Sequence, residues 1–180
     1  MKFSILHYLT LDSTNNTAKE LAEGGAREGT VIFSDYQTKG RGRFKRKWVS
    51  SKGKDLLFSV ILRPSKLKAS HASMITQVTA MSIQKVLGRF GVSTKIKRPN
   101  DLLVDGKKIC GILVESSTSS NMIDYVVVGV GLNINTPKKE LFKGAASMYE
   151  VLGKQTERGN LLQGLLEDFG KRITELGWSS

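Results

Sequence analysis

The most distinctive chemistry in the sequence lies in a basic loop at residues 39–47. Six of its nine residues are lysine or arginine, and none is acidic. Gly40 and Gly42 alternate with Arg41 and Arg43. Glycine lets the backbone take a positive φ or approach a ligand closely, and each guanidinium offers a planar fork of donors to a carboxylate or phosphate. The spacing therefore predicts a loop that binds an anion.

The distribution of charge supports an anionic partner. The chain has 28 Lys and Arg residues against 16 Asp and Glu, a formal net charge of +12, and residues 39–47 supply +6 of it. An excess concentrated in one place argues for an anionic partner, whereas a dispersed excess would argue only for solubility. The residues alone leave open whether that partner is a small phosphorylated or carboxylated ligand or a nucleic-acid backbone.

Two further polar clusters interrupt the apolar segments. At residues 12–15, Ser13, Thr14 and Asn15 are of the types that cap helices. The cluster at residues 97–111 is mostly cationic around Asp101, which suits phosphate more than acid–base hydrolysis by paired carboxylates. All three clusters fall at strand ends or in a hairpin, so one edge of a sheet can bring them together.

Cysteine and histidine usage restricts the remaining chemistry. Cys110 is the one cysteine, so an internal disulfide or a Cys-based zinc site is excluded, and two histidines give little support to a metal site or a Ser-His-Asp triad. No 18-residue apolar run or signal-peptide pattern occurs. We expect a cytoplasmic protein with no membrane partner, in which Cys110 is a small buried residue and not a nucleophile.

The elements that position these clusters follow from hydrophobic periodicity. Strands are predicted at residues 3–11, 30–36, 56–62, 93–97 and 125–130, and a hairpin at 102–104 and 108–115 around Asp105-Gly106. Helices are predicted from Ser13 to Gly24-Gly25, at residues 70–87 and at 162–176. Because hairpins mix with crossovers, we expect a single α+β domain over residues 1–180, with a mixed β-sheet and flanking helices.

Four motifs occur in order along the chain. They are Gly40-Arg41-Gly42-Arg43, preceded by Gln37 and followed by Trp48; Lys97-X-Pro99-Asn100-Asp101; Lys108-X-X-Gly111-Ile112-Leu113-Val114-Glu115; and Gly129-Val130-Gly131-Leu132-Asn133. Together they resemble the ordered motifs of biotin–protein ligases. One such motif is weak evidence, but four at matching spacing are strong. The resemblance spans roughly residues 8–136 and implies a catalytic-domain fold similar to that of class II aminoacyl-tRNA synthetases.

The resemblance implies an ATP-dependent ligase. In that family MgATP activates biotin to biotinyl-5′-adenylate, and biotin then passes to a lysine of the biotin carboxyl carrier domain of acetyl-CoA carboxylase or a similar carboxylase. Biotin would be bound by Ser13, Thr14, Asn15, Gln37, Gly40, Arg41, Gly42, Arg43, Lys108 and Gly111. The nucleotide would contact Arg41, Arg43, Trp48, Lys97, Asn100 and Asn133. The catalytic residues would be Lys108, Arg43 and Asp101, with Mg²⁺ arriving with ATP near Asp101 and not held by a side-chain cluster.

Elementary chemistry supports cations in these roles. Attack of a carboxylate on the α-phosphorus brings two anions together, so positioned cations such as Lys108 and Arg43 are needed more than a general base. In the transfer step the acceptor lysine must be neutral, and Asp101 is the nearest candidate to accept or steer its proton. We also expect residues 39–47 to be mobile without ligand and to become ordered over the adenylate.

Departures from the family pattern define the alternatives. Lys45 stands where glycine is usual, and Arg98 where tryptophan is usual. We expect no N-terminal helix-turn-helix domain, hence no DNA binding, and no C-terminal β-barrel domain. The alternatives are a basic nucleic-acid-binding module, in which Phe44 and Trp48 would stack on bases, and a lipoate ligase or acyltransferase of related fold, which lacks the Gly-Arg-Gly-Arg loop. A homodimer through a sheet edge is left open.

Overall fold

A mixed seven-stranded sheet forms the centre of the computed structural model, which describes residues 1–64, 72–119 and 122–178 and all of their side chains except that of Lys45. The strand order is β1-β2-β3-β7-β6-β5-β4. The strands are β1 (Ser4–Tyr8), β2 (Thr30–Ser34), β3 (Leu56–Leu62), β4 (Lys95–Lys97), β5 (Asp101–Val104), β6 (Lys107–Ser119) and β7 (Met122–Leu132). β1 and β2 are parallel, and the other neighbours are antiparallel. The predicted α+β class with a mixed sheet is confirmed.

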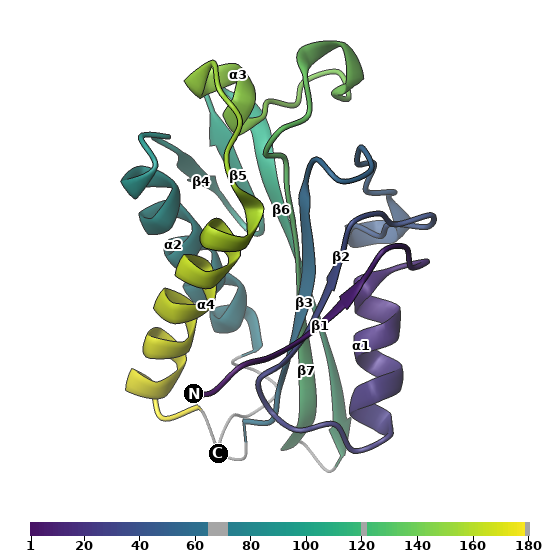
Figure 1. Ribbon diagram of the computed structural model, residues 1–180. Helices are drawn as coiled ribbons and strands as arrows, with labels where there is room; N and C mark the ends of the chain where they lie inside the picture. The colour runs from purple at the N-terminus through teal and green to yellow at the C-terminus, as the bar shows by residue number, and fades with distance from the viewer. Residues whose placement is uncertain (65–71, 120–121, 179–180) are drawn as a thin grey trace.

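Helices cover both faces of this sheet. They are α1 (Thr14–Glu23), α2 (Ala72–Arg89), α3 (Met148–Leu152) and α4 (Arg158–Glu175), with 3₁₀ turns at Arg43–Lys45 and Lys138–Glu140. α1 lies on one face, while α2 and α4 pack together on the other (Figure 1). The three predicted helices are confirmed, although Ser70 and His71, expected at the start of the second one, lie outside the described residues.

Side chains of the central strands alternate between two cores. Leu56 and Val60 of β3 face the larger core with α2 and α4, whereas Ile61 faces a smaller core beneath α1. Both faces of β3 are therefore covered, as its continuous apolar sequence predicts. Among the described residues, no helix has the length and apolar character needed to cross a membrane.

The structure confirms the predicted hairpin turn, but two strands end at other residues than predicted. Asp105 and Gly106 both have positive φ, 48° and 75°, as a tight hairpin turn requires, and this prediction is confirmed. β1 ends at Tyr8 and not at residue 11, because the chain bends there and Leu11 forms only an isolated bridge to Gln37. β7 is longer than predicted because it pairs with both β3 and β6 along its length.

A buried carboxylate joins α4 to α2, and its removal should destabilise the fold. The Asp168 side chain is 4 % exposed, with its oxygens 2.6 Å from Lys85 Nζ and 2.7 Å from Arg172 Nε. Burial raises the pKa of Asp168, but hydrogen bonds from Lys85 and Arg172 outweigh it and hold the pKa below its ordinary value of 3.8. Asp168→Asn should lower the free energy of unfolding by about 1–3 kcal/mol at neutral pH, measured by urea denaturation.

The pH dependence of this loss checks its cause. Because the folded-state pKa is depressed, the carboxylate stabilises the fold above its unfolded pKa, and this contribution disappears as the pH falls through the folded value. The difference between the wild type and Asp168→Asn should therefore shrink below about pH 4. An equal difference at acid and neutral pH would contradict the ionic origin.

Candidate active site

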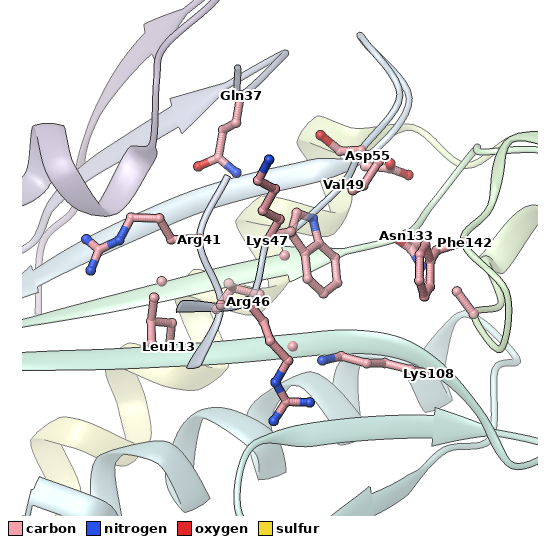
Figure 2. Close-up of a pocket in the computed structure, with 18 of the residues that line it drawn as sticks. Gln37, Arg41, Arg46, Lys47, Val49, Asp55, Lys108, Leu113, Asn133 and Phe142 are labelled. Atoms are coloured by element: carbon pink, nitrogen blue, oxygen red, sulfur yellow. The ribbon is translucent and has the colours of Figure 1, made fainter. Parts of the chain in front are cut away.

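A cavity of about 610 Å³ lies on the sheet face that carries α1, beside the first turn of that helix (Figure 2). Its floor is formed by β6 and β7, and its walls by the basic loop with the residues that follow it and by residues 140–145. The charged side chains lining it are Arg41, Arg43, Arg46, Lys47, Lys108, Lys143, Asp55, Asp101 and Glu140. Six cations against three carboxylates give the lining a charge of +3 (6 − 3), so the cavity suits an anionic ligand.

Part of the floor is bare backbone, because three of the β6 and β7 positions on the α1 face are glycines. Along β7, Val127 packs beneath α1, and the next two residues on that face are Gly129 and Gly131. Gly111 of β6 lies directly opposite Gly131. A Cβ would lie 2.4 Å from the Trp48 ring at Gly131 and 2.9 Å from it at Gly111. These glycines let Trp48 contact the sheet.

The first turn of α1 brings hydroxyl and amide groups to one end of the cavity. The Thr14 N–H donates to Gln37 Oε1 at 2.7 Å, and the Thr14 hydroxyl donates to the same oxygen at 3.1 Å. The buried Ser59 hydroxyl lies 2.8 Å from Thr14 Oγ1 and 2.7 Å from Asn15 Oδ1. Ser13 occupies the N-cap position, but its side chain makes no capping hydrogen bond. We call these five residues the amide end of the cavity.

The other end carries an ion pair. Lys108 Nζ lies 2.7 Å from Asp101 Oδ1 and 5.4 Å from the centre of the Trp48 ring. Arg43 Nη1 donates to Asn100 Oδ1 at 3.2 Å, and the Asn100 amide donates to a carbonyl of β6 at 3.0 Å. Lys108 is thus held by Asp101, and Arg43 by Asn100. We call Lys108, Asp101, Arg43 and Asn100 the cationic end.

The basic loop folds as a hairpin whose arms meet at a glycine. The Trp48 N–H donates to the Gly40 carbonyl at 2.9 Å, and the Gly42 N–H donates to the Arg46 carbonyl at 2.7 Å. A Cβ at Gly40 would lie 2.4 Å from the Trp48 carbonyl oxygen, so Gly40 provides close approach between the arms. Gly42, with φ −127°, does not take a positive φ; the loop turns instead at Phe44, with φ 55°, whose side chain is 78 % exposed.

The two arginines of the Gly-Arg-Gly-Arg motif reach different ends of the cavity. Arg41 Nη2 donates to Glu115 Oε1 at 2.7 Å, and Nη1 donates to Glu115 Oε2 at 3.2 Å and to Asn16 Oδ1 at 2.6 Å. In Figure 2 the Arg41 guanidinium points away from Lys108. Arg43, in contrast, lies at the cationic end. The charge of Arg41 is therefore engaged by Glu115, next to the amide end.

Most of the predicted site residues line this one cavity. They are Ser13, Thr14, Asn15, Gln37, Arg41, Gly42, Arg43, Trp48, Asn100, Asp101, Lys108, Gly111 and Asn133. Gly40 and Lys97 do not. Gly40 is buried between the arms of the loop, and Lys97 is exposed on β4, the outermost strand of the sheet. The Asn133 amide donates to the Ala146 carbonyl at 3.0 Å, which ties the end of β7 to the segment before α3.

Sequence reasoning missed several polar residues at or beside the cavity, among them Ser59, Glu115 and Asp55. Ser59 could have been found as a hydroxyl residue inside an otherwise apolar strand. Glu115 could have been found as the last residue of one of the four motifs, although no role was assigned to it. Asp55 is buried and accepts hydrogen bonds from two backbone N–H groups and from the Thr136 hydroxyl, the last at 2.8 Å. Burial raises the pKa of Asp55, and these hydrogen bonds oppose the rise.

The donor set has consequences for metal and thiol chemistry. Among the described residues, no group of three or more His, Cys, Asp and Glu side chains could hold a metal ion. Asp101 is engaged by Lys108, so a Mg²⁺ ion at this end would take most of its ligands from the phosphates of the nucleotide that carries it. Cys110 is fully buried, as predicted, and burial raises the pKa of its thiol, so it is no nucleophile.

The sheet, the glycine floor and the cationic end together define a class of protein. The chain belongs to the biotin/lipoate A/B protein ligase family, whose model matches residues 7–133. It is 36 % identical over 176 residues to the bifunctional ligase/repressor BirA of Bacillus subtilis, covering 95 % of this chain and 54 % of that protein. It is 38 % identical over 126 residues to the biotin–[acetyl-CoA-carboxylase] ligase of Paracoccus denitrificans, covering 68 % of this chain and 51 % of that protein.

A solved structure has the same fold. The biotin protein ligase of Aquifex aeolicus, in complex with biotin and ATP, superposes with a TM-score of 0.82 at 30 % sequence identity, covering 97 % of this chain and 72 % of that one. This chain spans about half the length of the two curated relatives.

Proposed function

We propose that this chain is the catalytic part of a biotin–protein ligase, which uses MgATP to make biotinyl-5′-AMP and then transfers biotin to a lysine of a biotin carboxyl carrier domain. The observation that carries the proposal is the division of one cavity into an amide end and a cationic end over a glycine floor. Membership of the ligase family and the biotin and ATP bound to the Aquifex aeolicus relative support it.

The amide end suits the head group of biotin. That head group is a cyclic urea, with two N–H donors and one carbonyl acceptor, and it carries no charge. Hydroxyl and amide side chains that are already held in place can hydrogen-bond to such a group with little loss of conformational entropy on binding. Thr14, Asn15 and Ser59 are fixed by hydrogen bonds of 2.7–2.8 Å to one another or to Gln37.

The cationic end suits the first reaction. A biotin carboxylate oxygen bonds to the α-phosphorus of ATP, the bond to the bridging oxygen breaks, and pyrophosphate leaves with its electron pair. Two anions meet in this step, and negative charge grows on the phosphoryl oxygens. Lys108 and Arg43, held by Asp101 and Asn100, would stabilise that charge without moving far.

The second reaction releases AMP. The neutral amine of the carrier lysine attacks the carbonyl carbon of the mixed anhydride, the carbon–oxygen bond to AMP breaks, and one amine proton is lost. Asp101, whose carboxylate lies 2.7 Å from Lys108 Nζ, is the group we assign to accept or steer that proton. The proposal includes a cytoplasmic location, which suits the buried free thiol of Cys110.

The nucleic-acid-binding alternative is less well supported by the geometry. Arg41 is paired with Glu115, so its guanidinium is not free for a phosphate backbone, and Arg43 lines the cavity, which suits a small phosphorylated ligand. Trp48 is half-buried against the glycine floor of the cavity and is not presented on the outer surface with the loop. Of the two aromatic residues in this stretch, Phe44 and Trp48, Phe44 is the one presented outward.

One experiment separates the three candidate functions. The protein is incubated with MgATP, a carrier domain, and either biotin or lipoate. The mass of the carrier is then measured by mass spectrometry. We expect biotinylated carrier. A lipoylated carrier would favour a lipoate ligase, while no modified carrier together with single-stranded RNA binding of steep salt dependence would favour the nucleic-acid module.

Arg43 should control retention of the intermediate. Arg43→Gly removes the guanidinium that spans from the basic loop to Asn100, so the loop no longer closes on the cationic end. We expect biotinyl-5′-AMP to escape about 10–100-fold faster, measured as free biotinyl-5′-AMP in the filtrate and as biotinylation of a bystander protein. Arg89→Gly, at the exposed end of α2, is the matched control. Full retention of the adenylate by Arg43→Gly would contradict this role.

A further inference from the structure

We propose that Glu115 is a positioning residue that latches the basic loop beside the amide end by holding Arg41. Glu115 is the final residue of β6's motif, and it does not line the cavity, so it would not touch biotin or ATP. The effect of this latch on biotin binding and adenylate release rests on the proposed function. The contact between Glu115 and Arg41 can be tested without measuring ligase activity.

The contacts of Glu115 come from two separate segments of the chain. Both of its oxygens accept from the Arg41 guanidinium, at 2.7 and 3.2 Å, in the forked arrangement that gives arginine–carboxylate pairs their directionality. Its Oε2 also accepts from Asn15 Nδ2 at 2.8 Å. One carboxylate therefore ties the basic loop to the first turn of α1.

Glu115 also fixes which way the Asn15 amide faces. Asn15 Nδ2 donates to Glu115 and, at 3.3 Å, to the Leu113 carbonyl, so the amide oxygen must point the other way, toward Ser59. With the carboxylate removed, the amide could rotate and present its NH₂ group to Ser59. Glu115 therefore holds Arg41 and, together with the Leu113 carbonyl, sets the hydrogen-bonding pattern of the amide end.

Polar contacts form a chain that begins at Gln37, just before the basic loop, and ends at Arg41 within it. It runs from Gln37 to the Thr14 N–H, from the Thr14 hydroxyl through Ser59 and Asn15 to Glu115, and from there to Arg41. The segment between Gln37 and Arg41 is therefore clamped at both ends. The hairpin beyond it, with Phe44 at its tip, is left as the part that can move.

The charge of the loop explains why a carboxylate is needed. Residues 39–47 carry six cations that repel one another. Among the described side chains, Arg41–Glu115 is the ion pair that links a cation of this loop to a carboxylate. A neutral residue at position 115 would leave the repulsion unopposed at the base of the loop.

The test compares Glu115→Gln with Glu20→Gln, an exposed carboxylate on the outside of α1. Chymotrypsin cleavage after the exposed Phe44 reports how often the loop opens without any ligand. We expect cleavage of Glu115→Gln to be about tenfold faster than that of the wild type and of Glu20→Gln. The KM for biotin and the rate of adenylate release should rise by a similar factor, with kcat of adenylation changed less than twofold because the cationic end is untouched.

A double-mutant cycle with Arg41→Gln separates the latch from a general structural role. If the pair acts as a unit, the double variant should match either single variant in cleavage rate and in adenylate release. Additive effects, or a Glu115→Gln protein that is cleaved and releases adenylate like the wild type, would overturn the inference. If Glu115→Gln does not fold, Arg41→Gln alone must give both effects, or the inference fails.

The same experiment keeps the two proposals apart. A wild-type protein that makes no biotinyl-5′-AMP would refute the proposed function, while the cleavage rates would still decide whether Glu115 holds the loop. A wild-type protein that makes the adenylate, with Glu115→Gln unchanged in every measurement, would refute the latch alone.

Discussion

Lys108→Ala should abolish formation of biotinyl-5′-AMP while leaving the fold intact. Lys108 is the ammonium of the cationic end, fixed 2.7 Å from Asp101, and no other lysine lies beside that carboxylate among the described contacts. Removing one preorganised group that stabilises transition-state charge costs about 10²–10³-fold in rate, and here the group also offsets repulsion between two anions. We expect at least that loss in biotin-dependent pyrophosphate exchange.

The stability of this variant distinguishes chemistry from folding. The Lys108 side chain is 37 % exposed, and a pair so open to solvent contributes only about 0–1 kcal/mol to the free energy of unfolding. Urea denaturation of Lys108→Ala should therefore resemble that of the wild type. Lys107→Ala, at the exposed preceding position of β6, is the matched control and should retain activity. Full turnover by Lys108→Ala would remove this lysine from its proposed role.

Gly129→Ala should damage both the fold and biotin binding, because the floor has no room for a methyl group. A Cβ at this position would lie 1.9 Å from Asn15 Oδ1 and 2.8 Å from its Cγ. Asn15 would have to turn away from Ser59, Leu113 and Glu115. With three hydrogen bonds each contributing about 1 kcal/mol, the free energy of unfolding should fall by about 2–3 kcal/mol.

Biotin binding should report the same displacement. Loss of the ordered amide end should weaken biotin affinity by about 100-fold, measured by isothermal titration calorimetry. Gly88→Ala in α2 is the matched control: a Cβ there meets no atom within 4 Å. That substitution should raise stability by about 0.5–1 kcal/mol, because alanine favours a helix over glycine. Wild-type stability and affinity in Gly129→Ala would contradict the role of the bare floor.

These two substitutions affect opposite ends of one site. In the proposed function, the amide end would recognise a neutral polar group by its hydrogen-bonding pattern, and the cationic end would stabilise charge that appears during the reaction. The basic loop contributes one arginine to each end, Arg41 through Glu115 and Arg43 through Asn100. Movement of this loop would therefore couple ligand recognition to protection of the adenylate from water.

Much of the architecture and most of the site could be predicted from the sequence. Local patterns are enough for elements whose causes are local: the Asp105-Gly106 turn, the long amphipathic α4, and the apolar β3. The motif residues from Ser13 to Asn133 could be placed in one site because their order and spacing match a family. The boundaries of β1 and β7 were less accurate, since pairing with neighbouring strands, and not local composition, sets where a strand ends.

The sequence alone determined that residues 39–47 form a basic, glycine-containing loop, and it predicted that this loop binds an anion, since charge and glycine spacing are properties of the chain. Only the tertiary structure decided what each residue of the loop does. Gly40 serves contact between the arms of the loop, and Arg41 is paired with Glu115, 74 residues away. Lys97 falls at the edge of the sheet, outside the cavity. The direction of a side chain depends on which distant strand or helix lies beside it, and no local pattern contains that information.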